Sequence, residues 1–452
     1  MFPSSTSPDR IGLPFVATIE SAWLKYPGYA VDVLPFRGTG RARVDEQLLA
    51  ESTACLIVRE SDHRDQLYFP RRDIDATVLA DSDHRTVCPF KGEASYASVS
   101  VPDGTLENAL WWYPTPMNEV GSLRGYAAFY DDRVEVTASI PLADGEEATV
   151  RLPWWGTAGD LAALMDVVPL GNGIFTAPTY PNPPLGTFIK MAWHKARRNV
   201  IEGGQLMGAA IVAASKTQPD QRVTSAHMAF VKAASFDDPL HVVVDPRRRG
   251  STLSVFDVEV EQAGVLRATG LVMSDSGADD LIRHTVAMPD VPPPAECPRY
   301  DFGVLGREIR VVDGAYALDC RPGGPPELYV WTRFASAPES VAAHQALLTQ
   351  ATTHYSVSAA LRPHDGISEG DAHRTVSMGP VNASIAFHDE VDVTEWLLTE
   401  TRSIWAGRGL TQSEVRVFSS DGRLVASKTV QAIVRSFPRT LEQMGHDYSS
   451  AM

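Results

Sequence analysis

The pattern of hydrophobic and polar positions is most distinctive at residues 199–216, which read NVIEGGQLMGAAIVAASK. Two glycines, Gly203 and Gly204, precede an apolar run with almost no polar face, so we expect a helix that is buried on all sides. A helix entered through a glycine turn presents unpaired backbone N–H groups and the positive end of its dipole. A polarised carbonyl or an anion would suit that position.

The first third of the chain has a different pattern. Short alternating or aromatic segments, such as CLIVRE, LYFPRRD and YASVSVPDG, are separated by turn residues. They predict a mainly-β domain over residues 1–150, with a boundary near the segments ADGEE and LPWWGTAGD. A short amphipathic helix carrying Leu161, Leu164 and Met165 follows and breaks at Pro169.

Long alternating segments follow the buried helix, and their order recurs in the second half of the chain. Phe230 and Phe387 are 157 residues apart (387 − 230), and Gly250 and Gly409 are 159 apart (409 − 250). We therefore expect two copies of one unit, each a sheet curled around a helix, at residues 160–287 and 301–440. Residues 342–360 supply the second helix, and the proline-rich residues 288–300 form a semi-rigid linker.

Composition and charge narrow the class of protein. With 452 residues, of which 44% are apolar and 21% charged, the chain is long enough for two to four globular domains. A net charge of −16 with only short basic clusters argues against a nucleic-acid partner. The four cysteines are widely spaced, so we expect neither disulfides nor a metal site, and a reducing, cytoplasmic environment. We also expect the protein to be neither secreted nor embedded in a membrane.

The N-terminal domain contains the segment CPFKGEASY, which runs from Cys88 to Tyr96. This segment resembles the hallmark of a small β-tent domain family of unknown function, C-P-F/Y-K-G-E-A-x-Y. Two chemical roles are conceivable: a reactive Cys88 thiol beside Lys91, or metal ligation by His84 and Cys88. One cysteine and one histidine do not complete a zinc site, so a binding or regulatory role is the favoured interpretation.

Residues 161–437 resemble the acyl-CoA thioesterase II family. The matching segments, in the family's order, are GGQLMGAAIVAA, SAHMAFVK, RRGST, LYVWTRF, HQALL, FHDEVDVTEWLL, GRG and SSDGRLVAS. The resemblance implies an α+β fold: a double hotdog, in which two antiparallel sheets each wrap around a central helix, behind the N-terminal mainly-β domain. It also implies that an acyl thioester, of coenzyme A or another carrier, binds where the helices meet the shared sheet.

Thioester hydrolysis needs backbone N–H groups that stabilise the developing oxyanion, and a base or polar cluster that orients water. The predicted helix start meets the first need with Gly203, Gly204 and Gln205. In the family, an aspartate, a threonine or serine, and a glutamine hold the water. The resemblance places three other residues at these positions: Thr353, Pro380 and Val430. A threonine cannot act as a general base at neutral pH, so the second need must be met differently or not at all.

Several polar residues nearby are candidate replacements. Glu202, directly before the glycines, is either a general base or a plain capping residue, because a helix start favours a carboxylate in both roles. His354 is either a catalytic group or a packed histidine. The remaining candidate catalytic residues are Thr353, Asn382 and Gln431, and the further candidate substrate contacts are Ser384 and Arg249. Arg249 and the basic residues 195–198 suit the phosphates of coenzyme A, and they equally suit a solvated surface.

Three functions remain open at this point. The first is an acyl thioester hydrolase with an atypical site and no cofactor. The second is a non-hydrolytic hotdog enzyme, such as a cyclase, dehydratase or isomerase acting on a biosynthetic intermediate, although the D-x-N-P-x-H pattern of hotdog hydratases is missing. The third is a non-catalytic acyl-binding protein. A homo-oligomer is compatible with this architecture, because hotdog sheets often pair edge to edge.

Overall fold

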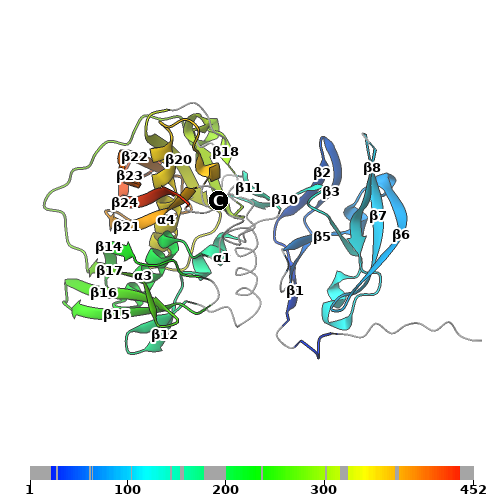
Figure 1. Cartoon of the computed structure of the whole chain (residues 1–452), viewed down its shortest axis with the longest axis horizontal. Coiled ribbons are helices and arrows are strands. Elements are labelled where there is room, and N and C mark those ends of the chain that lie inside the picture. Colours follow the sequence, from blue (N-terminus) through cyan, green and yellow to red (C-terminus); the bar gives the residue numbers. More distant parts are fainter. Residues whose placement is uncertain are drawn as a thin grey trace, which may run out of the picture.

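The structure is a computed structural model of the whole chain. It describes residues 22–26, 29–60, 63, 65–102, 104–142, 145–152, 157–177, 200–235, 238–300, 303–315, 324–371 and 376–437. The basic residues 195–198 lie outside the described residues. An N-terminal β domain stands beside a larger part that contains the long helices (Figure 1).

The N-terminal domain consists of two antiparallel sheets. The first has seven strands in the order β1 (Val31–Pro35), β4 (Leu56–Glu60), β5 (Gln66–Pro70), β9 (Tyr126–Phe129), β8 (Gly104–Trp112), β7 (Gly92–Val101) and β6 (Leu79–Cys88). The second has four, in the order β11 (Glu147–Arg151), β10 (Glu135–Pro141), β2 (Thr39–Val44) and β3 (Gln47–Ser52). Apolar side chains of both sheets, including Leu49, Phe69 and Leu110, pack together in one core. The predicted mainly-β domain is confirmed.

The larger part is built on one antiparallel sheet of thirteen strands. The first six are β12 (Val168–Gly171), β13 (Ile174–Thr176), β15 (His241–Arg248), β16 (Leu253–Gln262), β17 (Val265–Asp275) and β14 (Arg222–Phe230). The other seven are β21 (Val376–Phe387), β24 (Leu424–Ser436), β23 (Leu410–Ser419), β22 (Leu397–Gly407), β20 (Glu327–Phe334), β19 (Arg307–Val311) and β18 (Arg299–Tyr300). The two halves of this sheet are visible in green and in yellow to red in Figure 1.

The two halves meet where β14 pairs with β21. His227 pairs with Ser384 in this register, and these residues are 157 positions apart, the same offset that relates Phe230 to Phe387. Equivalent residues of the two copies therefore face each other at the seam, as they must where a two-fold axis relates two units. The predicted duplication and the double-hotdog fold are confirmed.

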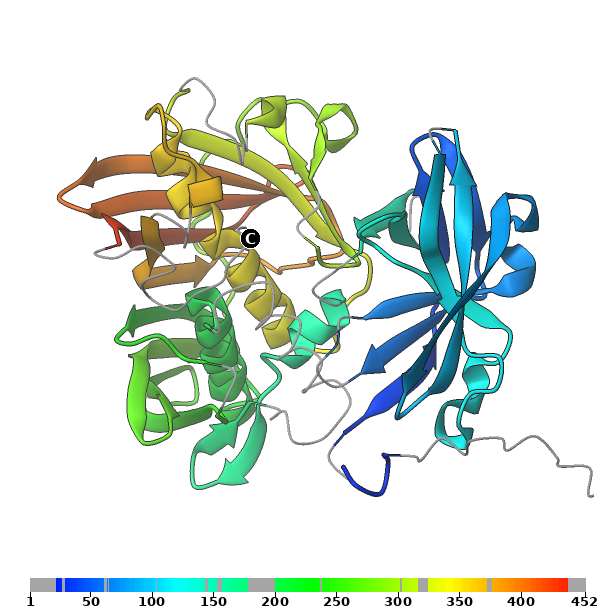
Figure 2. The ribbon, with the colours of Figure 1, turned by 45° about the vertical axis from the view of Figure 1, so that its right-hand side comes forward.

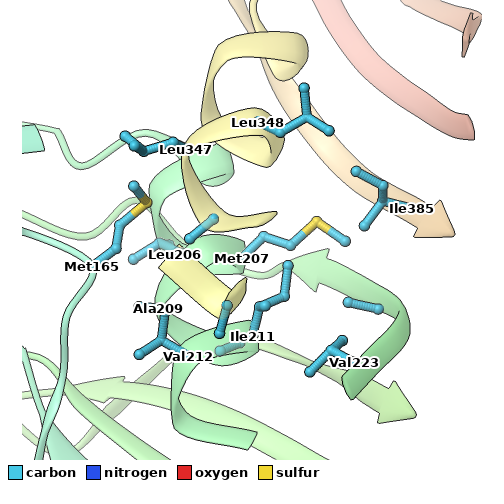
Figure 3. Packing of buried hydrophobic residues seen from close by; sticks show 14 of the residues in the cluster. Met165, Leu206, Met207, Ala209, Ile211, Val212, Val223, Leu347, Leu348 and Ile385 are labelled. Atoms are coloured by element: carbon cyan, nitrogen blue, oxygen red, sulfur yellow. The ribbon is translucent and has the colours of Figure 1, made fainter. Parts of the chain in front are cut away.

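Three helices lie against the inner face of this sheet: α3 (Gly203–Thr217), α4 (Val341–Thr353) and α5 (Tyr355–Leu361). Every residue of α3 from Gly204 to Ala214 is buried, as the apolar run predicts. Figure 3 shows Leu347 of α4 near Met165 and Leu206, and Ile211 of α3 below Met207 on the side of Val223, all within one apolar core. The short helix α1 (Ala158–Ala163) adds Met165, just beyond its end, to the same core.

The second helix, predicted over residues 342–360, is present as α4 and α5, which meet at His354, and the His354 backbone itself has helical angles of φ −65° and ψ −42°. The hydroxyls of Thr349, Thr352 and Thr353 donate to carbonyls of the preceding turn, which competes with the backbone pattern and often bends helices. Lys428 of β24 adds a further donor to the Thr349 carbonyl, at 2.8 Å. Side-chain hydrogen bonds thus accompany the division of this helix.

One buried ion pair, one partly exposed ion pair and apolar contacts join the two parts of the protein. Arg59 of β4 lies 3.1 Å from Asp160 of α1, and both side chains are buried. Arg333 of β20 pairs with Glu146, beside β11, at 2.9 Å. Leu305, from the thioesterase-like part, packs into the core of the N-terminal domain. The N-terminal domain is therefore docked on the double hotdog, next to α1 (Figure 2).

Candidate active site

The start of α3 lacks a side-chain cap. Glu202 occupies the capping position with an extended backbone, but its side chain makes no capping hydrogen bond. Its carbonyl accepts from the N–H groups of Gln205 and Leu206. The N–H groups of Gly203 and Gly204 have no acceptor inside the helix, and they lie at the positive end of its dipole. Glu202 is therefore the N-cap residue of α3 by its backbone position, without a side-chain capping hydrogen bond.

The end of α4 lies directly against these glycines. A β-carbon built on Gly204 would come within 2.6 Å of Thr353 Oγ1 and 3.0 Å of Gln350 Cα. One built on Gly203 would come within 2.8 Å of Pro380 Cγ. Two of the three positions that the resemblance assigns to the family's water-holding residues, Thr353 and Pro380, therefore do meet the start of α3. Only glycine allows this close approach of the two backbones.

The Glu202 carboxylate is held by α4. Gln350 Nε2 donates to Glu202 Oε2 at 2.7 Å, and Arg307 Nη1 of β19 lies 3.5 Å from Gln350 Oε1. Gln350 is buried and stands one turn before Thr353. Neither Gln350 nor Arg307 is distinguished by a motif in the sequence. A carboxylate therefore stands beside the glycine N–H groups, although the family's aspartate position itself carries a threonine.

Lys428 of β24 also contacts the end of α4, and no motif in the sequence marks it as a site residue. Its ammonium group donates to Thr349 O at 2.8 Å and Thr352 Oγ1 at 3.3 Å, and to Thr353 Oγ1. Its side chain is buried, which lowers the pKa of Lys428 to about 7. The signal was present in the sequence, because Lys428 continues the inward-facing series of Ala426, Val430 and Ala432 at the strand period.

Three predicted site residues lie on the opposite face of the sheet. Side chains alternate between the two faces of a strand, and Ala383 and Val430 point into the core. Their neighbours Asn382, Ser384 and Gln431 therefore point outward. There Asn382 Nδ2 donates to Gln431 Oε1 at 3.3 Å, and Ser384 contacts His227. The structure does not bring these three residues together with Glu202.

The other predicted residues differ in their distance from the start of α3 and in burial. Gln205 is buried in the first turn of α3, and its Oε1 has no hydrogen-bond partner among the described residues. His354 is half-buried between α4 and α5, edge-on to Tyr355. Arg249 is exposed beyond β15, next to Gly250, whose carbonyl accepts from Gln221 near the C-terminal end of α3. Because α3 rises about 1.5 Å per residue, Arg249 is far from Gly203.

The CPFKG segment of the N-terminal domain lies in a cluster of ionic and aromatic contacts. Lys91 forms a buried ion pair with Glu60, which also accepts from the Tyr29 hydroxyl at 3.0 Å. No group of three potential metal ligands occurs among the described residues. His84 packs on Tyr96 instead, with ring centroids 4.5 Å apart. Lys91 therefore neutralises Glu60, and the motif is part of a packed aromatic and ionic cluster.

Three family models match the chain. They are the domain of unknown function DUF427 at residues 32–139, the acyl-CoA thioesterase N-terminal domain at residues 191–274, and the acyl-CoA thioesterase C-terminal domain at residues 285–434. The second and third lie in consecutive order over the two halves of the large sheet.

Curated proteins and solved structures give the same pattern. Human acyl-coenzyme A thioesterase 8 is 26% identical over 282 residues, which cover 55% of this chain and 84% of that protein. Acyl-CoA thioesterase 2 of Haemophilus influenzae is 25% identical over 259 residues, which cover 52% and 87%. An acyl-CoA thioesterase II structure from Mycobacterium marinum aligns with a TM-score of 0.50 and 21% identity, over 62% and 99% of the two chains. Of the helices that the structure describes, none could cross a membrane.

Proposed function

The chain belongs to the acyl-CoA thioesterase II family, with an N-terminal DUF427 domain, and from this premise we propose that it hydrolyses an acyl thioester at the start of α3. Glu202 takes the place of the family's missing aspartate. The observation that carries this proposal is the hydrogen bond of 2.7 Å between Gln350 and Glu202, because it holds a carboxylate beside the N–H groups of Gly203 and Gly204, which have no acceptor within α3.

The proposed reaction uses these groups in two steps. The thioester carbonyl oxygen lies at the N–H groups of Gly203 and Gly204, and the carboxylate of Glu202 accepts a proton from the attacking water. A new C–O bond forms, and the oxyanion of the tetrahedral intermediate is stabilised by the glycine N–H groups and the helix dipole. The C–S bond then breaks, and the proton leaves on the thiol. The products are a free acid and a thiol.

Gln205 supports a substrate with amide groups near the thioester. Its buried Oε1 is an acceptor without a donor among the described residues, next to the proposed carbonyl position. A buried polar atom of this kind is expected to have a partner in the functional complex. An amide N–H of a pantetheine arm, which coenzyme A and acyl carrier proteins share, has the required chemistry. We propose that Gln205 orients this arm.

A second candidate function, a non-hydrolytic reaction on a bound thioester, is favoured by one observation. The family's carboxylate position is occupied by Thr353, and the charged group that contacts it is the cation Lys428. A positive charge at that point favours a developing enolate or alkoxide over the activation of water. In this case the site binds the thioester and releases no thiol.

One experiment distinguishes the two functions. The purified full chain is incubated with acyl-CoA substrates of short, medium and long chain, and free thiol is measured, for the wild type, Glu202→Gln and Glu395→Gln. Glu395 is the matched control, because it is an exposed glutamate. Hydrolysis predicts thiol release that falls about 100-fold or more in Glu202→Gln and is unchanged in the control. Saturable acyl-CoA binding without thiol release would instead support the second function.

A further inference from the structure

Lys428 has an environment that is rare for a lysine. Its side chain is only 3% exposed, and it points from β24 to the inner face of the sheet. Its partners in the strand register are apolar and buried: Ile385 on β21 and Val415 on β23. Lysines are seldom buried unless they are paired with a charge, because desolvation of the ammonium group is costly.

The groups that bind Lys428 are all neutral. A lysine ammonium group has three donors, and the structure gives Lys428 three acceptors: Thr349 O, Thr352 Oγ1 and Thr353 Oγ1. They belong to the last two turns of α4. No carboxylate within 4.0 Å pairs with Lys428 among the described residues, and burial is the one cause of its lowered pKa. An apolar side chain would fill the same space without this desolvation cost, so the ammonium group itself is the feature to be explained.

The same threonine connects Lys428 to the proposed active site. Thr353 receives the hydrogen bond from Lys428, donates its own proton to Thr349 O at 2.7 Å, and lies against Gly204 of α3. Gln350, which holds Glu202, lies three residues before Thr353 on α4. The ammonium group also lies at the C-terminal end of α4, where the helix dipole favours a cation. The hydrogen bonds of Lys428 therefore hold the end of α4, which lies against the start of α3.

We propose that Lys428 is a positioning residue for this site: its ammonium group fixes the hydroxyl of Thr353 and the last carbonyls of α4, and thereby sets the distance between Gln350, Glu202 and the glycine N–H groups. This role rests on the proposed function, because it assumes that Glu202 and the helix start act on the substrate. Lys428 does not itself touch the substrate, since all of its donors are used on α4.

The test compares Lys428→Met, Thr353→Val and the double variant with the wild type. Lys232→Met is the control, because Lys232 is an exposed lysine of the same part of the protein. We expect kcat for thiol release to fall about 10- to 100-fold in Lys428→Met, with KM nearly unchanged, because the reacting groups are misplaced. We expect the double variant to be no slower than Lys428→Met alone, because both substitutions interrupt one connection. Additive losses, or an unchanged kcat in Lys428→Met, would overturn the proposal.

Hydrogen exchange gives a second measurement that does not need turnover. In Lys428→Met, amides of residues 349–361 and 205–207 should exchange faster than in the wild type, while Lys232→Met should leave them unchanged. If the wild type releases no thiol but this exchange pattern appears, the proposed hydrolysis fails and the positioning of α4 by Lys428 stands. If exchange at both segments is unaffected, the positioning role is wrong whatever the activity.

Discussion

The α-carbon of Gly204 lies against the side chain of Thr353, so closely that a β-carbon there would come within 2.6 Å of the threonine hydroxyl oxygen. These residues belong to different halves of the duplication, and their contact places the start of one helix on the end of the other. Gly204→Ala should therefore destabilise the protein by about 1–3 kcal/mol, because the Gln350 backbone is also within 3.0 Å and cannot easily move. Thiol release should fall with it.

Urea unfolding checks this prediction. Gly121→Ala is a suitable control, because a β-carbon at Gly121 meets nothing within 4 Å and its backbone is not left-handed. Its unfolding free energy should stay within about 0.5 kcal/mol of the wild type. Equal stability of the two variants would mean that the helices have room to separate.

The buried Lys428 should make stability depend on pH. Its pKa is about 7 in the folded chain and about 10.4 when exposed, so the unfolded chain binds more protons between these values. The unfolding free energy should accordingly rise with pH in this window, by roughly 1 kcal/mol per pH unit. Lys428→Met should be more stable than the wild type below about pH 7, and its advantage should shrink toward about pH 10. Denaturant unfolding at several pH values measures this difference in unfolding free energy between Lys428→Met and the wild type. A difference that does not change with pH would contradict the prediction.

Glu369 should have the opposite dependence. It is buried next to Ser358, whose hydroxyl donates to it at 2.6 Å, and burial raises its pKa to about 7 from an ordinary 4.5. The folded chain binds more protons between these values, so this contribution to stability is lost as pH rises through them. Glu369→Gln should gain stability relative to the wild type at about pH 8 and little at about pH 4. The exposed Glu395→Gln should show no such difference in thermal unfolding.

The ion pair between Arg59 and Asp160 should be important for the attachment of the N-terminal domain. Asp160→Ala removes a buried partner of Arg59, which also lies 3.6 Å from Asp65, and it removes the capping box at the start of α1. We expect a loss of about 3 kcal/mol or more and earlier unfolding of the N-terminal domain in calorimetry. Asp166→Ala, at an exposed ion pair with Lys216, should cost less than about 1 kcal/mol. Similar losses in both variants would mean that the domain junction does not depend on this pair.

Much of the fold follows from the sequence, because its strongest signals are periodic. The apolar run of α3 predicts a helix without an exposed side, and the offset of 157 predicts two copies of one unit, whereas the pairing of His227 with Ser384 is known only from the structure. The division of the second helix at His354 was not predictable from the apolar pattern, since it is accompanied by hydrogen bonds of Thr349, Thr353 and a lysine from a distant strand.

The site was harder to predict, because successive side chains of a strand point to opposite faces of the sheet. Gln431 is one position from Val430, and that single step moves it to the outer face. Glu202 and Thr353 were identified correctly as neighbours of the glycine turn, through the order of the family segments. The residue types of Gln350 and Lys428 did not indicate buried site positions, since glutamine and lysine are usually exposed.

The seam that relates the two halves leaves them chemically unequal. At the start of α4, Ser340 Oγ accepts from the N–H of Ala343 at 3.2 Å, whereas the side chain of Glu202 leaves the start of α3 uncapped. The duplication thus gives the chain two equivalent helix starts, and the Ser340 side chain caps the one that begins α4. A titration with a thioester analogue should consequently saturate at one equivalent per chain. The half that contains α4 would then support the site at the start of α3 without binding a thioester itself.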